Sequence, residues 1–194
     1  MDILDFPETA TLHRVRNLRM NKSILPKQRG VYAWFFETAP DQVPTRGCLR
    51  REGMYLLYIG TAGADLRKKG NLYRRLGASH LSGNERRSTL MQTFAAVMSE
   101  LSGPAIAKLE PKGLKYHTSK SGEMAMREWM DLNTAVCWIE HPAPAEVEAE
   151  LIDRYRTPLN IEFAAHPFAP LLSEKRIRRR KEAVPFNANV DASV

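Results

Sequence analysis

Cysteine is scarce in this chain, and long apolar runs are missing. The two cysteines, Cys48 and Cys137, lie far apart and neither belongs to a CxxC pair, which excludes a disulfide framework and a zinc ribbon readable from the sequence. No apolar run approaches the ~18 residues that a membrane-spanning helix needs, so we expect no membrane partner. The first residues, MDILDFP, lack the basic and apolar regions of a signal peptide. We therefore expect a protein of the reducing cytoplasm.

The chain otherwise has ordinary globular composition with an excess of positive charge. Hydrophobic residues make up 43% of its 194 residues and charged residues 26%, which excludes whole-chain disorder and collagen-like structure. The length fits one domain of roughly 150 residues with extensions. Lys and Arg number 29 and Asp and Glu 22, so the net charge is 29 − 22 = +7. This excess favours a polyanionic partner.

The positive charge is concentrated in two segments. Residues 63–90 hold seven basic and two acidic residues, a net of +5, and residues 171–184 hold six basic and two acidic residues, a net of +4. The rest of the chain is therefore slightly acidic, at 7 − 9 = −2. Either segment could be a solvated face or a grip on a polyanion.

Apolar periodicity and turn residues predict a mixed α/β (α+β) fold. The predicted strands are 30–36, 54–60 and 135–139, and the predicted helices are 71–81, 88–101, 122–133 and 144–156. The spacing of Leu12, Val15 and Leu18 predicts one further short amphipathic helix near the N-terminus. Strands adjacent in sequence should pair antiparallel, which gives a small three-stranded, mainly antiparallel sheet flanked by helices. We divide the chain into an N-terminal helical extension (1–28), a central domain (29–165) and a basic, partly disordered tail (166–194).

Glu148 is the most informative residue of the predicted helix 144–156. On a helical wheel at about 100° per residue, it falls inside the apolar arc that runs from Val147 to Ile152. A carboxylate facing the core is costly unless it is paired or coordinated. It is either paired with an arginine at a wet cleft, or a metal ligand or acid–base group.

Three further positions have both an ordinary and a chemical interpretation. Tyr32 and Tyr58 lie in predicted strands, where a tyrosine usually serves the core, and Gly60 permits a close approach at the end of its strand. Arg75 falls at the edge of the buried stripe of its helix, from which an arginine can bind phosphate or simply remain on the surface. His80, at the end of the same helix, could interact with the helix dipole.

Together these residues resemble the GIY-YIG nuclease superfamily. The two signature tripeptides are similar to Gly30-Val31-Tyr32 and Tyr58-Ile59-Gly60. Three further elements follow in the family's order. The first is NLYRRL at 71–76, in which Arg75 stands at the position of the family's catalytic arginine. The second is EAELI at 148–152, in which Glu148 stands at the position of the family's glutamate, and the third is the Pro-x-Asn that ends at Asn160. The resemblance covers residues 28–162. Thr61 stands where many members carry a basic residue, and His80 lies one residue farther from the arginine than is usual.

The resemblance implies a phosphodiester hydrolase acting on DNA, with residues 29–165 as the nuclease domain. Tyr32 would be the general base or water-positioning group, Tyr58 would support it, and Arg75 would stabilise the charge of the transition state. Glu148 would hold one Mg²⁺ or Mn²⁺ ion, completed by water and phosphate oxygens. The expected supporting residues are Gly30, Gly60 and Asn160. The expected nucleic-acid-binding residues are Lys68, Lys69, Arg74, His80, Arg86 and Arg87.

Two alternatives and two open questions accompany this interpretation. The chain could be a catalytically inactive nucleic-acid-binding module of the same fold, or the basic tail could be the functional element, docking on nucleic acid or on a protein. No separate recognition domain is visible in the sequence, which counts against site-specific homing. A homodimer would be needed for concerted double-strand cuts, but neither the oligomeric state nor the DNA target is encoded in a recognisable motif.

Overall fold

A five-stranded antiparallel sheet forms the centre of the protein. The computed structural model describes residues 2–182, except 41, 66, 68, 82–87, 99–108, 113–114 and 164–165. The sheet order is β1-β7-β2-β4-β3. Its strands are β1 (His13–Arg14), β2 (Gly30–Phe36), β3 (Arg50–Arg51), β4 (Met54–Ala62) and β7 (Thr134–Glu140). The three long strands confirm the three predicted ones, and β2 pairs antiparallel with both β4 and β7.

The prediction of a three-stranded sheet was wrong at the edges. β1 and β3 are two residues long and consist of charged or polar residues, so neither shows the alternation by which a strand is read from a sequence. A separate hairpin pairs β5 (Leu109–Lys112) with β6 (Lys115–Thr118). None of the described helices is long and apolar enough to cross a membrane.

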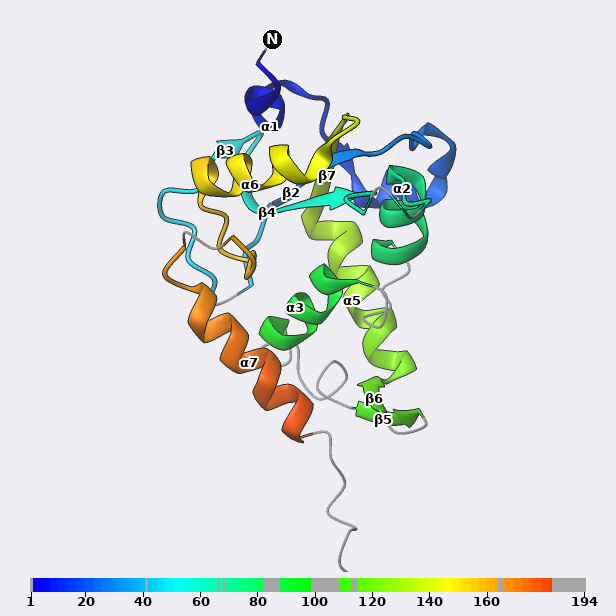
Figure 1. The fold of residues 1–194 in the computed structure, drawn as a ribbon. Helices are drawn as coiled ribbons and strands as arrows, with labels where there is room; N and C mark the ends of the chain where they lie inside the picture. The colour runs from blue at the N-terminus through cyan, green and yellow to red at the C-terminus, as the bar shows by residue number, and fades with distance from the viewer. Residues whose placement is uncertain are drawn as a thin grey trace, which may run out of the picture.

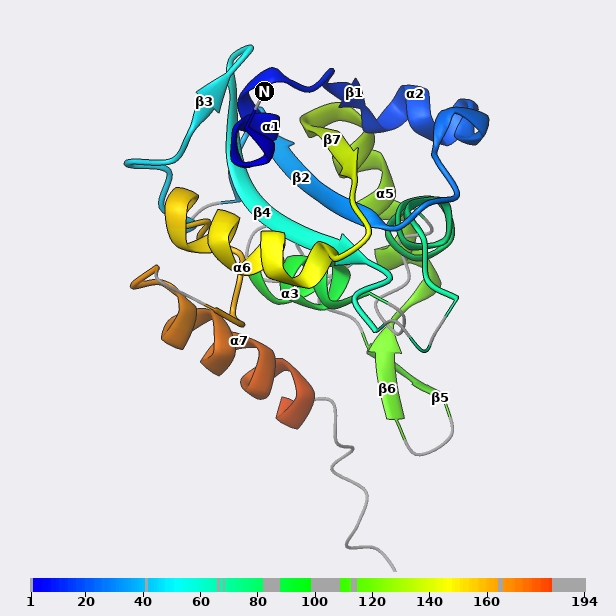
Figure 2. The same cartoon turned by 45° about the horizontal axis from the view of Figure 1, so that its top comes forward.

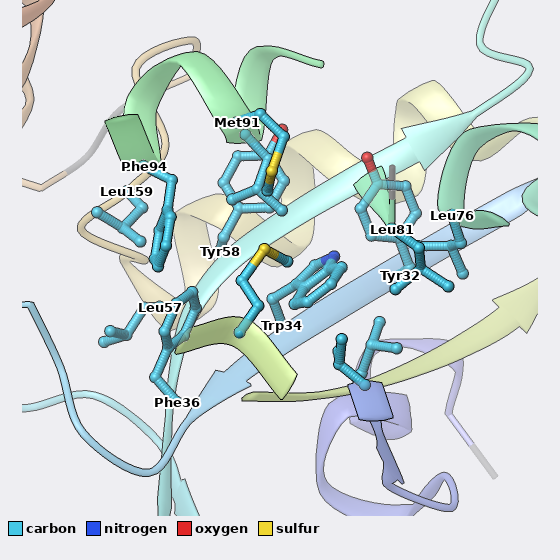
Figure 3. Packing of buried hydrophobic residues seen from close by; sticks show 14 of the residues in the cluster. Tyr32, Trp34, Phe36, Leu57, Tyr58, Leu76, Leu81, Met91, Phe94 and Leu159 are labelled. Atoms are coloured by element: carbon cyan, nitrogen blue, oxygen red, sulfur yellow. The ribbon is translucent and has the colours of Figure 1, made fainter. Parts of the chain in front are cut away.

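Helices cover both faces of the sheet. In β2, Val31, Ala33 and Phe35 pack with α1 (Phe6–Thr9) and α6 (Pro144–Tyr155). The alternate residues of the strand pack on the other side, with α3 (Thr89–Met98) and α5 (Lys120–Asn133). Figures 1 and 2 show this arrangement, and Figure 3 shows the second cluster, in which Tyr32 lies beside Leu76 and Leu81. Because both faces are covered, every residue of β2 is buried.

The N-terminal extension differs from the single helix predicted for it. It consists of η1 (Ile3–Asp5), α1, β1, α2 (Val15–Met20) and η2 (Lys22–Ile24). Leu12 packs on the cluster beside α6, whereas Val15 and Leu18 pack on the opposite side of the sheet. The i, i+3, i+6 spacing was therefore misleading, because β1 interrupts the helix and sends its apolar residues to two different cores.

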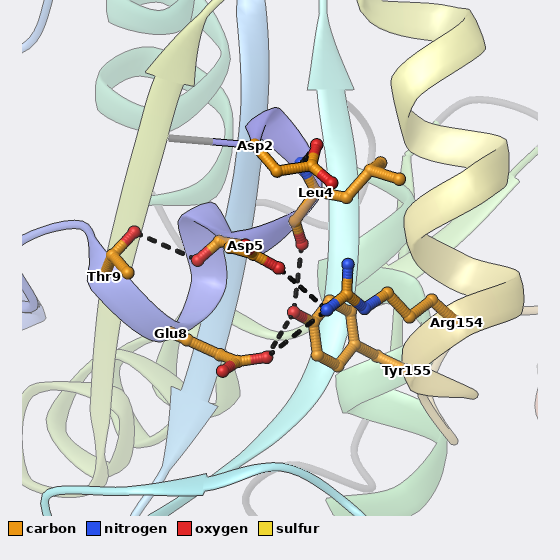
Figure 4. A network of polar contacts seen from close by, with 7 residues as sticks. All are labelled: Asp2, Leu4, Asp5, Glu8, Thr9, Arg154 and Tyr155. Atoms are coloured by element: carbon orange, nitrogen blue, oxygen red, sulfur yellow. Dashed lines mark hydrogen bonds and ion pairs between the residues drawn. The ribbon is translucent and has the colours of Figure 1, made fainter.

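A polar network ties α6 to this extension (Figure 4). Arg154 Nη2 lies 2.7 Å from Asp5 Oδ1. The Tyr155 hydroxyl donates to Glu8 Oε1 at 2.8 Å and lies 3.0 Å from the Leu4 carbonyl oxygen. The N-terminal residues thus hold the last turn of the helix that carries Glu148.

The segment predicted as a basic tail contains α7 (Ala169–Glu182), which packs against α3. Arg176 Nη2 donates to Gln92 Oε1 at 2.6 Å, and Arg179 Nη2 donates to Thr118 Oγ1 at 2.8 Å. Lys175 is also buried. Part of this positive charge therefore serves the packing of α7. Residues 183–194 lie outside the described part of the chain.

Candidate active site

The hydroxyl of Tyr32 is the centre of a buried hydrogen-bond network. Arg75 Nε donates to it at 3.2 Å, and His80 Nε2 lies 2.7 Å from it. The Tyr58 side chain forms a further hydrogen bond with that of Tyr32. Because Arg75 Nε–H can only donate, the Tyr32 oxygen accepts there, and its own proton is left for His80 Nε2 or for Tyr58.

A π-helix brings Arg75 and His80 to the same oxygen. The segment predicted as an α-helix over 71–81 forms η3 (Tyr73–His80), in which Leu81 N–H bonds to Leu76 O, five residues back. In an α-helix, residues five apart point about 140° away from each other. A π-helix turn closes one residue later, so residues five apart approach the same face. The π-helix turn therefore places His80 on the same side of the helix as Arg75, despite the one additional residue between them.

His80 belongs behind the site and not on a nucleic-acid surface, which corrects its predicted role. It is fully buried, and its Nδ1 lies 2.6 Å from Ser88 Oγ. Burial, helped by the Arg75 charge, holds the pKa of His80 well below its ordinary value. A neutral imidazole that donates from Nδ1 to Ser88 has Nε2 free to accept the Tyr32 proton.

Burial dominates the titration of the two tyrosines. It raises the pKa of Tyr32, against the opposing charge of Arg75, and raises the pKa of Tyr58 well above its ordinary value. Tyr32 is 0% exposed and Tyr58 is 7% exposed, so Tyr58 is the more accessible of the pair. Neither side chain is a ready phenolate at neutral pH. The Tyr32 oxygen in turn raises the pKa of Arg75, which is therefore a permanent cation.

Glu148 lies on α6, on the side of β4 opposite the tyrosines, and is half-buried. Thr61 Oγ1 donates to its Oε2 at 3.2 Å. Burial raises the pKa of Glu148 to about 7, and the nearby carboxylate of Glu162 adds to the rise, while Thr61 and Arg75 oppose it. The carboxylate therefore shares an electrostatic environment with Arg75 across the end of β4.

Two glycines let side chains and backbone approach closely here. A Cβ on Gly60 would lie 2.5 Å from the Tyr32 hydroxyl and 2.9 Å from Tyr58 Cε1, so any larger residue would displace the network. A Cβ on Gly30 would collide with the Ile139 carbonyl oxygen of β7.

Asn160 fixes the open edge of β4 between Tyr58 and Gly60. Its Oδ1 accepts from Ile59 N–H at 3.0 Å, and its Nδ2 donates to the Ile59 carbonyl at 2.8 Å. Thr157 Oγ1 also donates to Asn160 Oδ1, at 2.7 Å. The amide thus pairs with β4 as a neighbouring strand would, which keeps the two flanking residues in register.

The structure describes only some of the residues that were predicted to bind nucleic acid. Lys69 and Arg74 are exposed and lie close together, with Arg74 Nη1 donating to the Lys69 carbonyl at 3.0 Å. Lys68, Arg86 and Arg87 lie outside the described residues.

A family model of the GIY-YIG catalytic domain matches residues 30–182. This span covers more than half of the chain and includes every residue of the network. The chain belongs to the GIY-YIG family. No curated protein and no solved structure matches it. The family match extends through α7, past the predicted end of the central domain at residue 165.

Sequence reasoning missed three polar neighbours of the GIY-YIG residues. Thr61, noted only as a departure from the family pattern, donates to Glu148. Ser88, which we placed at the start of a helix, holds His80. Glu162 follows the Pro-x-Asn element and affects the pKa of Glu148. Thr61 directly follows the Tyr58-Ile59-Gly60 tripeptide, and this position could have indicated that it belongs to the site. Nothing in the sequence around Ser88 or Glu162 indicates their contacts.

The site fits a hard divalent cation bound through one carboxylate. Within the described ranges, no three His, Cys, Asp or Glu side chains gather into a metal-binding cluster. An ion at Glu148 would therefore take most of its ligands from water and substrate, as Mg²⁺ commonly does. The raised pKa of Glu148 also fits, since a nearby cation would compensate the cost of a half-buried carboxylate.

Proposed function

We propose that this protein is a metal-dependent DNA endonuclease that hydrolyses phosphodiester bonds. The observation that carries the proposal is the Tyr32 hydroxyl, held at once by Arg75, Tyr58 and the neutral His80, beside the raised-pKa carboxylate of Glu148. A fixed cation, hydroxyl groups that orient the attacking water and a metal-binding carboxylate are parts that phosphodiester hydrolysis uses. Membership of the GIY-YIG family supports the reaction class.

The hydrogen bonds hold the groups that would orient the attacking water. Tyr58 and Tyr32 stay neutral, since the raised pKa of each disfavours a phenolate. His80 also stays neutral, because its lowered pKa disfavours a buried imidazolium beside Arg75, and it holds the Tyr32 hydroxyl in place. The water oxygen bonds to phosphorus, the P–O bond to the leaving oxygen breaks, and the proton that the water loses ends on that leaving oxygen.

Arg75 and Glu148 act on the phosphate. The guanidinium of Arg75 is oriented through Nε by Tyr32, and its Nη groups supply positive charge as charge builds on the phosphate oxygens. Glu148 would hold the divalent ion, which when bound supplies Lewis-acid stabilisation of the phosphate and of the leaving oxygen. Thr61 orients the carboxylate.

The experiment is a cleavage assay on plasmid, flapped and branched DNA with Mg²⁺ or Mn²⁺. Arg75→Ala and Glu148→Ala should each lower the rate by about 100-fold or more. The matched controls are Arg16→Ala and Glu146→Ala, which remove exposed side chains of the same type and should cut as the wild type does. Undiminished cleavage by Glu148→Ala would refute the metal site.

The panel also tests the alternative of an inactive binding module. Salt-dependent DNA binding without metal-dependent cleavage of any substrate would favour that alternative. Products with both strands cut in one encounter would indicate that two copies act together. The exposed basic residues Arg178 and Lys181 test the basic tail without removing the packed helix α7. Weaker binding by Arg178→Gln/Lys181→Gln with intact hydrolysis at saturating DNA would assign the tail the docking role.

A further inference from the structure

A basic depression lies beside the proposed active site, outside the catalytic network. It has a volume of about 550 Å³, and the residues that line it include Lys27, Arg29, Lys69, Asn71, Glu140 and His141. Three cations and one carboxylate give it a formal charge of 3 − 1 = +2. A concave site of this charge favours an anionic ligand.

The three elements that form the depression also carry the active site. Arg29 precedes β2, which carries Tyr32, and Asn71 precedes η3, where Arg75 N–H bonds to the Asn71 carbonyl at 2.9 Å. Residues 140–142 connect β7 to α6, which carries Glu148. Figure 2 shows the start of β2, the end of β4 and the β7–α6 connection meeting at this end of the sheet.

Hydrogen bonds and a close backbone contact join the segments around the depression. Arg29 Nη1 donates to the Gly63 carbonyl at 3.0 Å, and the Arg29 carbonyl accepts from His141 N–H at 3.0 Å. Gly63 and Gly70 pinch the base of the loop that carries Lys69, where a Cβ on Gly63 would lie 2.6 Å from the Gly70 carbonyl oxygen.

The lining also presents donors. His141 Nδ1 accepts from Ala143 N–H at 3.2 Å, so a neutral His141 carries its proton on Nε2 and can donate from there. Lys27 and Lys69 are exposed. Ammonium and imidazole N–H groups are donors suited to phosphate oxygens.

We propose that this depression is a subsite for backbone phosphates of the nucleic-acid strand that flanks the phosphate being cut. Tyr32 lies three residues along β2 from Arg29, about 10 Å at strand rise. A nucleic-acid strand bound at the tyrosine can therefore bring a neighbouring backbone phosphate to the depression. The proposal rests on the proposed function, because it assumes a nucleic acid at the catalytic residues. The subsite reads no bases and fixes only the position of the strand.

The test measures binding and cleavage separately. Fluorescence anisotropy with a labelled 20-base-pair duplex and with a single strand of the same length, in EDTA, gives affinity without hydrolysis. The double variant Lys27→Gln/Lys69→Gln should bind roughly tenfold more weakly at 0.1 M salt, and its log–log salt slope should fall by about 2. Glu140→Gln removes the opposing carboxylate and should bind more tightly than the wild type. The two DNA arms show whether duplex or single-strand phosphate occupies the subsite.

Lys120→Gln is the matched control, because Lys120 is an exposed lysine on α5. Thermal unfolding of each variant separates lost binding from lost folding. The subsite is refuted if the wild type cuts DNA while the double variant and Glu140→Gln bind both DNAs as Lys120→Gln does. If the wild type neither binds nor cuts any DNA, the proposed function itself fails, and the subsite fails with it. Weaker binding of either DNA by the double variant, together with tighter binding by Glu140→Gln and unchanged thermal unfolding of both variants, supports the subsite.

Discussion

Removal of the Tyr32 hydroxyl is the sharpest perturbation of the network. Tyr32→Phe keeps the ring in its buried position but deprives Arg75, Tyr58 and His80 of a common partner. A buried polar group without its partner costs about 1–3 kcal/mol. His80 carries most of that cost, because it is fully buried and has no water to replace the hydroxyl. At roughly 2–4 °C per kcal/mol for a chain of this size, the melting temperature should fall by about 2–12 °C.

Two assays check this prediction together. Chemical denaturation should show a loss of about 1–3 kcal/mol in the unfolding free energy of Tyr32→Phe. Cleavage should fall by roughly 100-fold or more, because Arg75 and the attacking water lose the hydroxyl that orients them. Tyr155→Phe is the matched control: it removes a hydroxyl from the network of Figure 4, so stability falls and cleavage stays. A double-mutant cycle of Tyr32→Phe with His80→Gln should give a coupling energy of at least about 0.5 kcal/mol. Additive effects within error would refute the shared hydrogen bond.

Three further perturbations test the surroundings. Because the pKa of His80 is lowered, the unfolded chain binds a proton below about pH 6.5 that the native state does not bind. On acidification the unfolding free energy should therefore drop by up to about 1.4 kcal/mol per pH unit. Urea titrations at several pH values measure this drop, which should be smaller in His80→Gln. Asn160→Ala leaves the buried Ile59 N–H and carbonyl unpaired and should cost about 2–4 kcal/mol in chemical denaturation. Asn160→Asp should cost at least as much, because it sets a buried carboxylate oxygen against the Ile59 carbonyl oxygen. The pKa of Glu148 is raised to about 7 and its carboxylate must be deprotonated to bind metal, so calorimetric Mg²⁺ or Mn²⁺ affinity should rise as the pH passes through 7 and should be absent in Glu148→Gln.

The sequence was most informative where one element had a strong local pattern. The three long strands are continuous apolar runs, and the helix of Glu148 has a clear apolar arc with a proline at its start. Glu148 itself was identified from the wheel, because a carboxylate within such an arc needs a reason. The family match to residues 30–182 confirms the resemblance that the ordered motifs indicated.

Features that depend on tertiary contacts could not be predicted from the sequence. The strand β1 has only two residues, and its pairing with β7 depends on a partner more than 100 positions away. The π-helix of η3 has the composition of an α-helix, so the sequence predicted an α-helix with His80 at its end and gave no sign that His80 reaches Tyr32. The inward packing of Arg176 and Arg179 was also invisible, since a basic run looks the same in sequence whether it is solvated or docked.

Plasmid cleavage by the wild type and by Glu148→Gln, side by side in Mg²⁺, is the most direct test of the central claim. The glutamine keeps the shape of the side chain and its place beside Thr61 but removes the charge that would bind the ion. We predict that the wild type converts supercoiled DNA to cut products, that EDTA stops the reaction, and that Glu148→Gln is slower by about 100-fold or more. Equal cleavage by the two proteins, or wild-type cleavage that survives EDTA, would contradict the account.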